Sequence, residues 1–157
     1  MNRPEIKTMQ NLESAFAGES MAHIKYRYFA KLARAAGDEE TARTFEATAD
    51  QEVMHAFGHL DLLYPADTIT PARALQIAID GETYEYTEMY PGFRKTAEEE
   101  GNAAALAEID EQIAESKEHA ARFHATLAKA QKRFAALAKV EERHAQHYQK
   151  QLDKVSA

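Results

Sequence analysis

The sequence predicts an all-α fold. Only 6 Gly and 4 Pro occur among the 157 residues, which suits long helices better than a turn-rich β domain. Apolar residues recur at helical spacing between four interruptions, at residues 37–38, 64–71, 91–92 and 101–102. No Gly or Pro occurs from Asn102 to Ala157, so the last third of the chain should also be helical.

The first two helices are predicted over residues 4–36 and 38–64. Pro4 suits the first turn of a helix, where its missing N–H costs nothing. Asp38 follows Gly37 and can cap the second helix through its carboxylate. The apolar side of the second helix should consist of Phe45, Ala49, Val53 and Ala56.

A third helix should begin at Thr70-Pro71, a capping residue followed by a first-turn proline, and stop at Gly101. Pro91 lies inside it and should kink it or accompany a local distortion. The helical stretch after Gly101 is too long for one helix of a compact domain. We expect a turn near residues 128–131, or an unusually long helix exchanged between subunits.

Composition excludes several classes of protein. The formal net charge of −7 argues against a basic nucleic-acid-binding surface. The absence of cysteine excludes disulfides, thiolate zinc sites, iron–sulfur clusters and cysteine nucleophiles. No apolar run approaches the ~18 residues of a membrane span, and the first residues lack the apolar core of a signal peptide. We therefore expect one cytoplasmic domain over residues 1–157, with no membrane partner.

Two helical segments carry the same metal-binding pattern. Residues 45–55 and 134–144 each contain Phe, then Glu seven residues later, then Glu-x-x-His, which gives the pairs Glu52/His55 and Glu141/His144. Positions i and i+3 share a helix face, so each pair can hold a metal ion from one side.

The other two helices supply the complementary carboxylates Glu19, Glu85 and Glu88. One Glu from each of two helices, with Glu-x-x-His from two others, is the di-iron pattern of four-helix bundles. Five carboxylates can balance two divalent or two trivalent ions. Oxygen and imidazole ligands suit iron, and manganese or a mixed pair would also fit.

These motifs resemble the ferritin-like domain of the rubrerythrin family. The resemblance rests on residues 15–20 (AFAGES), 48–56, 85–91 (EYTEMYP) and 141–144. It implies an antiparallel four-helix bundle with two buried iron ions, which reduces hydrogen peroxide to water with electrons from a rubredoxin-like donor. The resemblance further implies that His144 is a permanent ligand, that one iron moves between Glu88 and His55, and that Tyr26 supports a ligand carboxylate through a hydrogen bond.

The chain departs from the family pattern in two ways. It carries no four-cysteine rubredoxin domain, so electrons should come from a separate protein, or turnover should be slow. The stretch from Gly101 to Glu141 is also longer than the family pattern, by about seven helical turns. A placement without a gap would put Ser116 and His119 at the last ligand positions, with Glu115 and Glu118 as nearby substitutes. We prefer Glu141 and His144, because the full Phe-Ala-Glu-His pattern is there, which makes the long stretch an extended or extra helical segment before the last metal-binding motif.

Three functions are compatible with these patterns to different degrees. The first is a di-iron peroxidase in oxidative stress defence. The second uses the same ligands to oxidise ferrous iron or to reduce dioxygen. The third is a helical module without metal, which leaves the repeated pattern unexplained. We expect a homodimer, with helix exchange as one arrangement.

Overall fold

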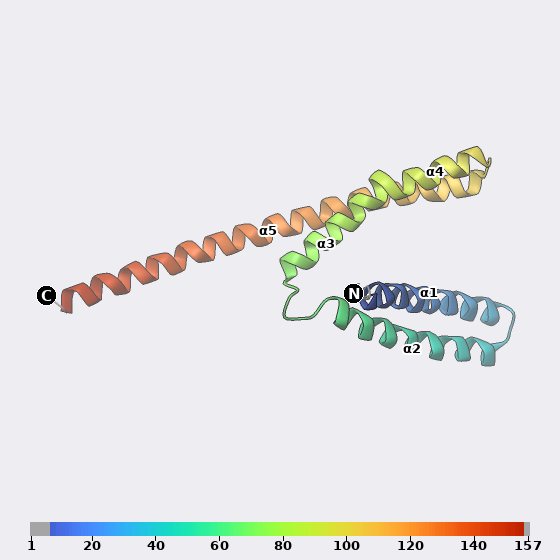
Figure 1. Ribbon diagram of the computed structural model, residues 1–157, viewed down its shortest axis with the longest axis horizontal. Helices are drawn as coiled ribbons and strands as arrows, with labels where there is room; N and C mark the ends of the chain where they lie inside the picture. Colours follow the sequence, from blue (N-terminus) through green and yellow to red (C-terminus); the bar gives the residue numbers. More distant parts are fainter. Residues whose placement is uncertain (1–6, 156–157) are drawn as a thin grey trace, which may run out of the picture. The chain divides into compact units, whose positions relative to one another are not determined.

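The computed structural model describes residues 7–155, which form helices and turns and no strand, so the all-α prediction is confirmed (Figure 1). Pro4 lies outside the described residues. In chain order the elements are α1 (Thr8–Ala35), α2 (Glu39–Leu63), α3 (Pro71–Tyr84), the π-helix η1 (Glu85–Met89), α4 (Tyr90–Glu99) and α5 (Ala103–Val155). They make two compact units, which divide between Ile69 and Thr70.

The first unit is a hairpin of α1 and α2 (Figure 1). Gly37 makes the turn with φ of 84°, which favours glycine, and the Asp38 carboxylate accepts a hydrogen bond from the Thr41 N–H at 3.0 Å, as predicted. Small buried residues recur every two turns along α2 and let the two helices approach closely: Ala42, Ala49 and Ala56.

Side chains tie the two helices of this hairpin together. The rings of Tyr26 and Phe29 on α1 pack against Phe45 on α2, with centroids 5.8 and 5.5 Å away. The His23 Nδ1 lies 2.9 Å from the carbonyl oxygen of Ala49, within hydrogen-bonding distance. These contacts fix how α1 and α2 face each other.

The second unit is also antiparallel. Thr70 caps α3 by accepting a hydrogen bond from the Arg73 N–H at 3.2 Å, as the sequence predicted. The run from α3 through η1 to α4 ends at Gly101, with φ of 67°, and α5 returns along it. Arg94 and Asp110 pair across α4 and α5 at 2.7 Å.

A π-helix interrupts the third predicted helix. The Tyr90 N–H donates to the Glu85 carbonyl, five residues earlier, instead of four as in an α-helix. Pro91 follows directly, so the local distortion predicted around Pro91 is present as η1. Single π-turns of this kind occur frequently at functional sites.

The last element is one uninterrupted helix. α5 has 53 residues and a length of about 80 Å, so the predicted turn near residues 128–131 is wrong. Residues 128–131 include no Gly, Pro or capping residue, and the apolar stripe of α5 continues through them at three- and four-residue spacing. Only the first part of α5 is accompanied by α3 and α4, whereas Phe134, Leu137 and Tyr148 farther along are 68%, 56% and 71% exposed (Figure 1).

None of the helices within residues 7–155 combines the length and the apolar character needed to cross a bilayer.

Candidate metal centre

The first unit brings together three of the predicted ligands. Glu19 on α1 and Glu52 and His55 on α2 each offer one ligand atom, and these atoms lie within 4.8 Å of one another. The His55 Nδ1 is 2.9 Å from Glu52 Oε2 and 4.0 Å from Glu19 Oε1. The side chains of Glu52, Glu19 and His55 are 15%, 30% and 59% exposed, so the carboxylates are largely desolvated and the imidazole is not.

Helical spacing explains this convergence. Glu52 lies between Ala49 and Ala56, three and four residues away, on the face of α2 that packs against α1. His55 follows Glu52 by three residues and extends from the rim of the same face. Glu19 belongs to the half-buried stripe of α1 that also contains Tyr26, two turns later.

The donor set fits iron or manganese. Two carboxylates supply hard oxygen ligands and the imidazole supplies a nitrogen ligand of intermediate hardness, and no thiolate competes with them. Two carboxylates at this distance also repel each other unless a cation lies between them. The Tyr26 hydroxyl makes no hydrogen bond to these carboxylates within residues 7–155, so its supporting role stays a prediction.

The second unit places Glu85 and Glu88 in the π-helix. The Ser116 hydroxyl of α5 donates to Glu85 Oε2 at 2.9 Å, whereas Glu88 is exposed. One turn before Glu85, the Glu82 Oε1 lies 3.3 Å from the His119 Nδ1. The other Glu82 oxygen, Oε2, is buried without a hydrogen-bond partner among the described residues.

These carboxylates also affect the neighbouring tyrosine. Burial raises the pKa of the Tyr90 phenol, and the negative charges of Glu85, Glu108 and Glu82 raise it further. The inner face of η1 is therefore an acidic, partly desolvated environment.

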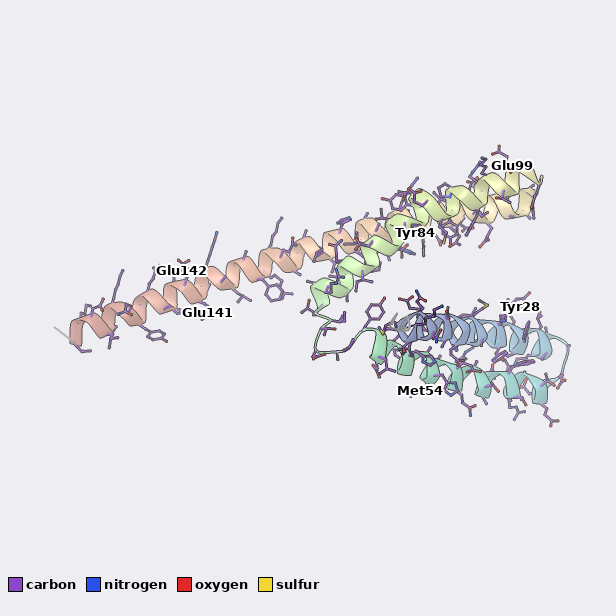
Figure 2. The ribbon with its side chains drawn as sticks, viewed as in Figure 1. Tyr28, Met54, Tyr84, Glu99, Glu141 and Glu142 are labelled. Atoms are coloured by element: carbon purple, nitrogen blue, oxygen red, sulfur yellow. The ribbon has the colours of Figure 1, made fainter. Side chains whose placement is uncertain are left out.

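The predicted ligands Glu141 and His144 lie elsewhere on α5. The His144 Nδ1 is 3.8 Å from Glu141 Oε2, and both side chains are more than half exposed. Figure 2 shows Glu141 on the part of α5 that extends beyond α3 and α4. Because a helix rises about 1.5 Å per residue, Glu141 is about 38 Å along α5 from Ser116. Within the second unit, the structure therefore brings Ser116 to Glu85 of the π-helix and His119 to Glu82 of α3, and it does not bring Glu141 and His144 there.

Two residues near η1 were not predicted as parts of the site. The sequence pattern indicates no role for Glu82. It marks Ser116 only as the residue that occupies the last glutamate ligand position when the family pattern is placed without a gap. The apolar stripe of α5 could have indicated Ser116. Ser116 and His119 lie in that stripe, on the side of α5 that would face α3 and η1 when the helix returns from Gly101. Glu115 and Glu118, the possible substitutes, are exposed.

Comparison with known proteins identifies the family. The family model described as Rubrerythrin matches residues 10–64 and 61–127, which is more than half of the chain. The chain belongs to the rubrerythrin family. The matched rubrerythrin regions contain Glu19, Glu52, His55, Glu85, Glu88, Ser116 and His119, whereas Glu141 and His144 lie beyond them.

Two curated rubrerythrin relatives agree with this assignment. Nigerythrin from Nitratidesulfovibrio vulgaris is 40% identical over 111 residues, which cover 63% of this chain and 55% of the relative. Rubrerythrin from Porphyromonas gingivalis is 40% identical over 134 residues, covering 78% of this chain and 66% of the relative. A solved structure, nigerythrin in its fully reduced, all-ferrous state, is 34% identical, covers 83% of this chain and 70% of its own, and has a TM-score of 0.41. The chain thus spans between about half and two thirds of the length of these two curated relatives.

Proposed function

We propose that this chain is a non-haem di-iron peroxidase, which reduces hydrogen peroxide to water in the cytoplasm as part of oxidative stress defence. The observation that carries the proposal is the convergence of Glu19, Glu52 and His55 in the first unit. Membership of the rubrerythrin family supports a di-iron protein of this kind. The electrons would come from an external rubredoxin-like donor.

Seven residues would hold the two iron ions. They are Glu19, Glu52, His55, Glu85, Glu88, Glu141 and His144. When bound, two ferrous ions would supply the two electrons that cleave the O–O bond of peroxide, and would act as Lewis acids toward the departing oxygens. Manganese or a mixed pair would suit the same ligands.

The protein side chains contribute charge balance and mobility. The five carboxylates carry a charge of −5, which matches a pair of ions that changes between +4 and +6. One ion would move between His55 and Glu88, which are both exposed, and His55 would give up its 2.9 Å contact with Glu52 Oε2 to follow it. The half-buried Glu52 and Glu19 would instead stay in place during turnover.

The oxidant distinguishes this proposal from its alternative. The experiment loads the chain anaerobically with two ferrous ions and mixes it with stoichiometric peroxide or with dioxygen, while near-ultraviolet absorption follows oxidation. We expect peroxide to react faster, and we expect Glu52→Gln to abolish the reaction while Glu13→Gln, an exposed change on α1, leaves it unchanged. Faster reaction with dioxygen would instead select an iron-oxidising or dioxygen-reducing protein.

We further propose that the chain forms a homodimer. The exposed apolar residues on the second half of α5 support this proposal, because an apolar stripe of this length is rarely left in water. Exchange of α5 between the two copies is the arrangement that would cover the stripe and place Glu141 and His144 in a metal site.

A further inference from the structure

Two stretches of α5 resemble each other at five of their 16 positions. Residues 115–130 and 140–155 align without a gap at a separation of about seven helical turns, so that counterparts lie on the same face of the helix. The aligned pairs are identical or aromatic at His119/His144, Ala120/Ala145, Phe123/Tyr148, Leu127/Leu152 and Lys129/Lys154. We call residues 115–130 the proximal copy and residues 140–155 the distal copy.

The two copies differ at the position three residues before the shared histidine. The distal copy has Glu141 there, and the proximal copy has Ser116. Ser116 is 4% exposed and is the buried polar residue of the described chain, with its hydroxyl donating to Glu85 Oε2. One turn along the helix, His119 lies beside the Glu82 carboxylate.

This difference changes what the proximal copy can do. A hydroxyl donates a hydrogen bond to a carboxylate, whereas a second ionised carboxylate only accepts and would repel it. The proximal copy therefore presents a donor to Glu85 instead of another ligand. The bond uses Oε2 of Glu85 and leaves Oε1 available as a ligand atom.

The π-helix makes such a donor useful. Glu85 begins η1, where the regular α-helical register changes, and its side chain would otherwise be free to choose among several rotamers. Hydrogen bonds from neighbouring side chains orient the carboxylates that bind metals. We propose that Ser116 is a positioning residue that holds the Glu85 carboxylate, so that the proximal copy supports a metal ligand and the distal copy provides ligands. The proposal rests on the proposed function, in which Glu85 binds iron.

Iron retention tests the positioning role. We expect Ser116→Ala to keep the helical content of the wild type but to lose ferrous iron to a chelator about 10-fold faster. The matched control is Thr126→Ala, which removes another hydroxyl of α5 that bonds only to its own helix, at the Arg122 carbonyl. Equal rates for Ser116→Ala and the wild type would overturn the proposal.

A second substitution separates support from ligation. Ser116→Glu introduces the residue of the distal copy into the proximal one. If Ser116 holds Glu85, the new carboxylate should repel Glu85 and speed iron loss. Slower iron loss from Ser116→Glu would mean that position 116 is a vacant ligand position, which overturns the positioning role.

A metal-free measurement keeps this proposal separate from the proposed function. In a double-mutant cycle of Ser116→Ala and Glu85→Ala on the full-length apoprotein, we expect a coupling of about tenfold in the unfolding equilibrium constant. The absence of coupling would overturn the proposal whether or not iron binds. A wild-type chain that retains no iron would overturn the proposed function, while the cycle would still decide whether Ser116 holds Glu85.

Discussion

At the residue scale, Glu19 and Glu52 bring two half-buried carboxylates together. Their side chains are 30% and 15% exposed, and their ligand atoms lie within 4.8 Å of each other and of His55. Without a cation, the repulsion between them opposes folding, because reduced solvation strengthens it. In the proposed metal site, the same repulsion would favour a bound cation at the expense of the stability of the empty protein.

Opposite effects on stability and on metal binding should therefore follow from one substitution. We expect Glu19→Gln to stabilise the metal-free protein by about 1 kcal/mol, because it removes one of the repelling charges. The same variant should bind iron more than about 10-fold more weakly, because it lacks a ligand carboxylate. Thermal unfolding of the apoprotein and iron titration measure the two effects. Glu13→Gln on the exposed side of α1 is the control, and parallel behaviour of the two variants would contradict the prediction.

The residues that the sequence could predict are those whose spacing alone determines their position. Glu52 and His55 share a face of α2 because they are three residues apart, and Glu19 belongs to the apolar stripe of α1. The last ligand pair could not be chosen in this way. Since the proximal and distal copies of α5 lie about seven turns apart, Ser116 and Glu141 have the same helical phase, and periodicity gives both the same orientation.

At the element scale, Arg34 connects the end of α1 to α2. Its guanidinium reaches Glu39 at 3.1 Å and Glu46 at 2.8 Å. Hydrogen bonds from Arg34 hold the pKa values of both carboxyl groups below the ordinary glutamate value, and they raise the pKa of Arg34 itself. The hairpin turn at Gly37 is thus closed by charged side chains as well as by the backbone.

The pH dependence of this contact has a definite sign. Glu39 and Glu46 have lowered pKa values in the folded state. Their contribution to the free energy of unfolding is therefore complete above the ordinary glutamate pKa of about 4.5, and it is lost as the pH falls through the lowered pKa values. We expect Arg34→Gln to lower the unfolding temperature at neutral pH, with a difference from the wild type that shrinks below about pH 4.5. Arg43→Gln, which removes a single exposed pair with Glu39, should have a smaller effect. A difference that grows on acidification would contradict this account.

The elements differ in how well the sequence predicts them. Helix ends with a chemical signal were predicted correctly, as at Asp38, Thr70 and Gly101. The π-helix was predicted only as an unspecified distortion, because a single change of hydrogen-bond register needs no particular residue type beyond Pro91. The turn near residues 128–131 was predicted from length alone, without a local signal, and α5 continues through it.

At the scale of the whole molecule, both units leave apolar side chains in water. The first exposes Ile24, Met54 and Phe57, which are 64%, 69% and 58% exposed, and the second exposes Leu137 and Tyr148. Helices of this length gain most of their stability from packing of their apolar face. The bundle predicted from the sequence would bury these residues, so we expect the native assembly to bury more surface than either unit does by itself.

The second half of α5 provides the test of that assembly. In the stripe that continues through Phe134, Leu137, Glu141, His144 and Tyr148, apolar or aromatic residues flank the two proposed ligands on both sides. Whatever packs on the apolar residues therefore also covers Glu141 and His144. In the proposed homodimer, loss of the stripe should dissociate the subunits and release iron together.

A charge-matched pair of variants separates this effect from helix propensity. Leu137→Asp with Tyr148→Asp places two charges in the stripe, and Ala136→Asp with Gln146→Asp places the same charges on the opposite face of α5. By analytical ultracentrifugation we expect the stripe variant to be monomeric, with fewer irons per chain, and the control variant to remain dimeric with its iron. A wild-type chain that sediments as a monomer and still binds two irons would contradict the homodimer, and would require Glu141 and His144 to act within their own chain or not at all.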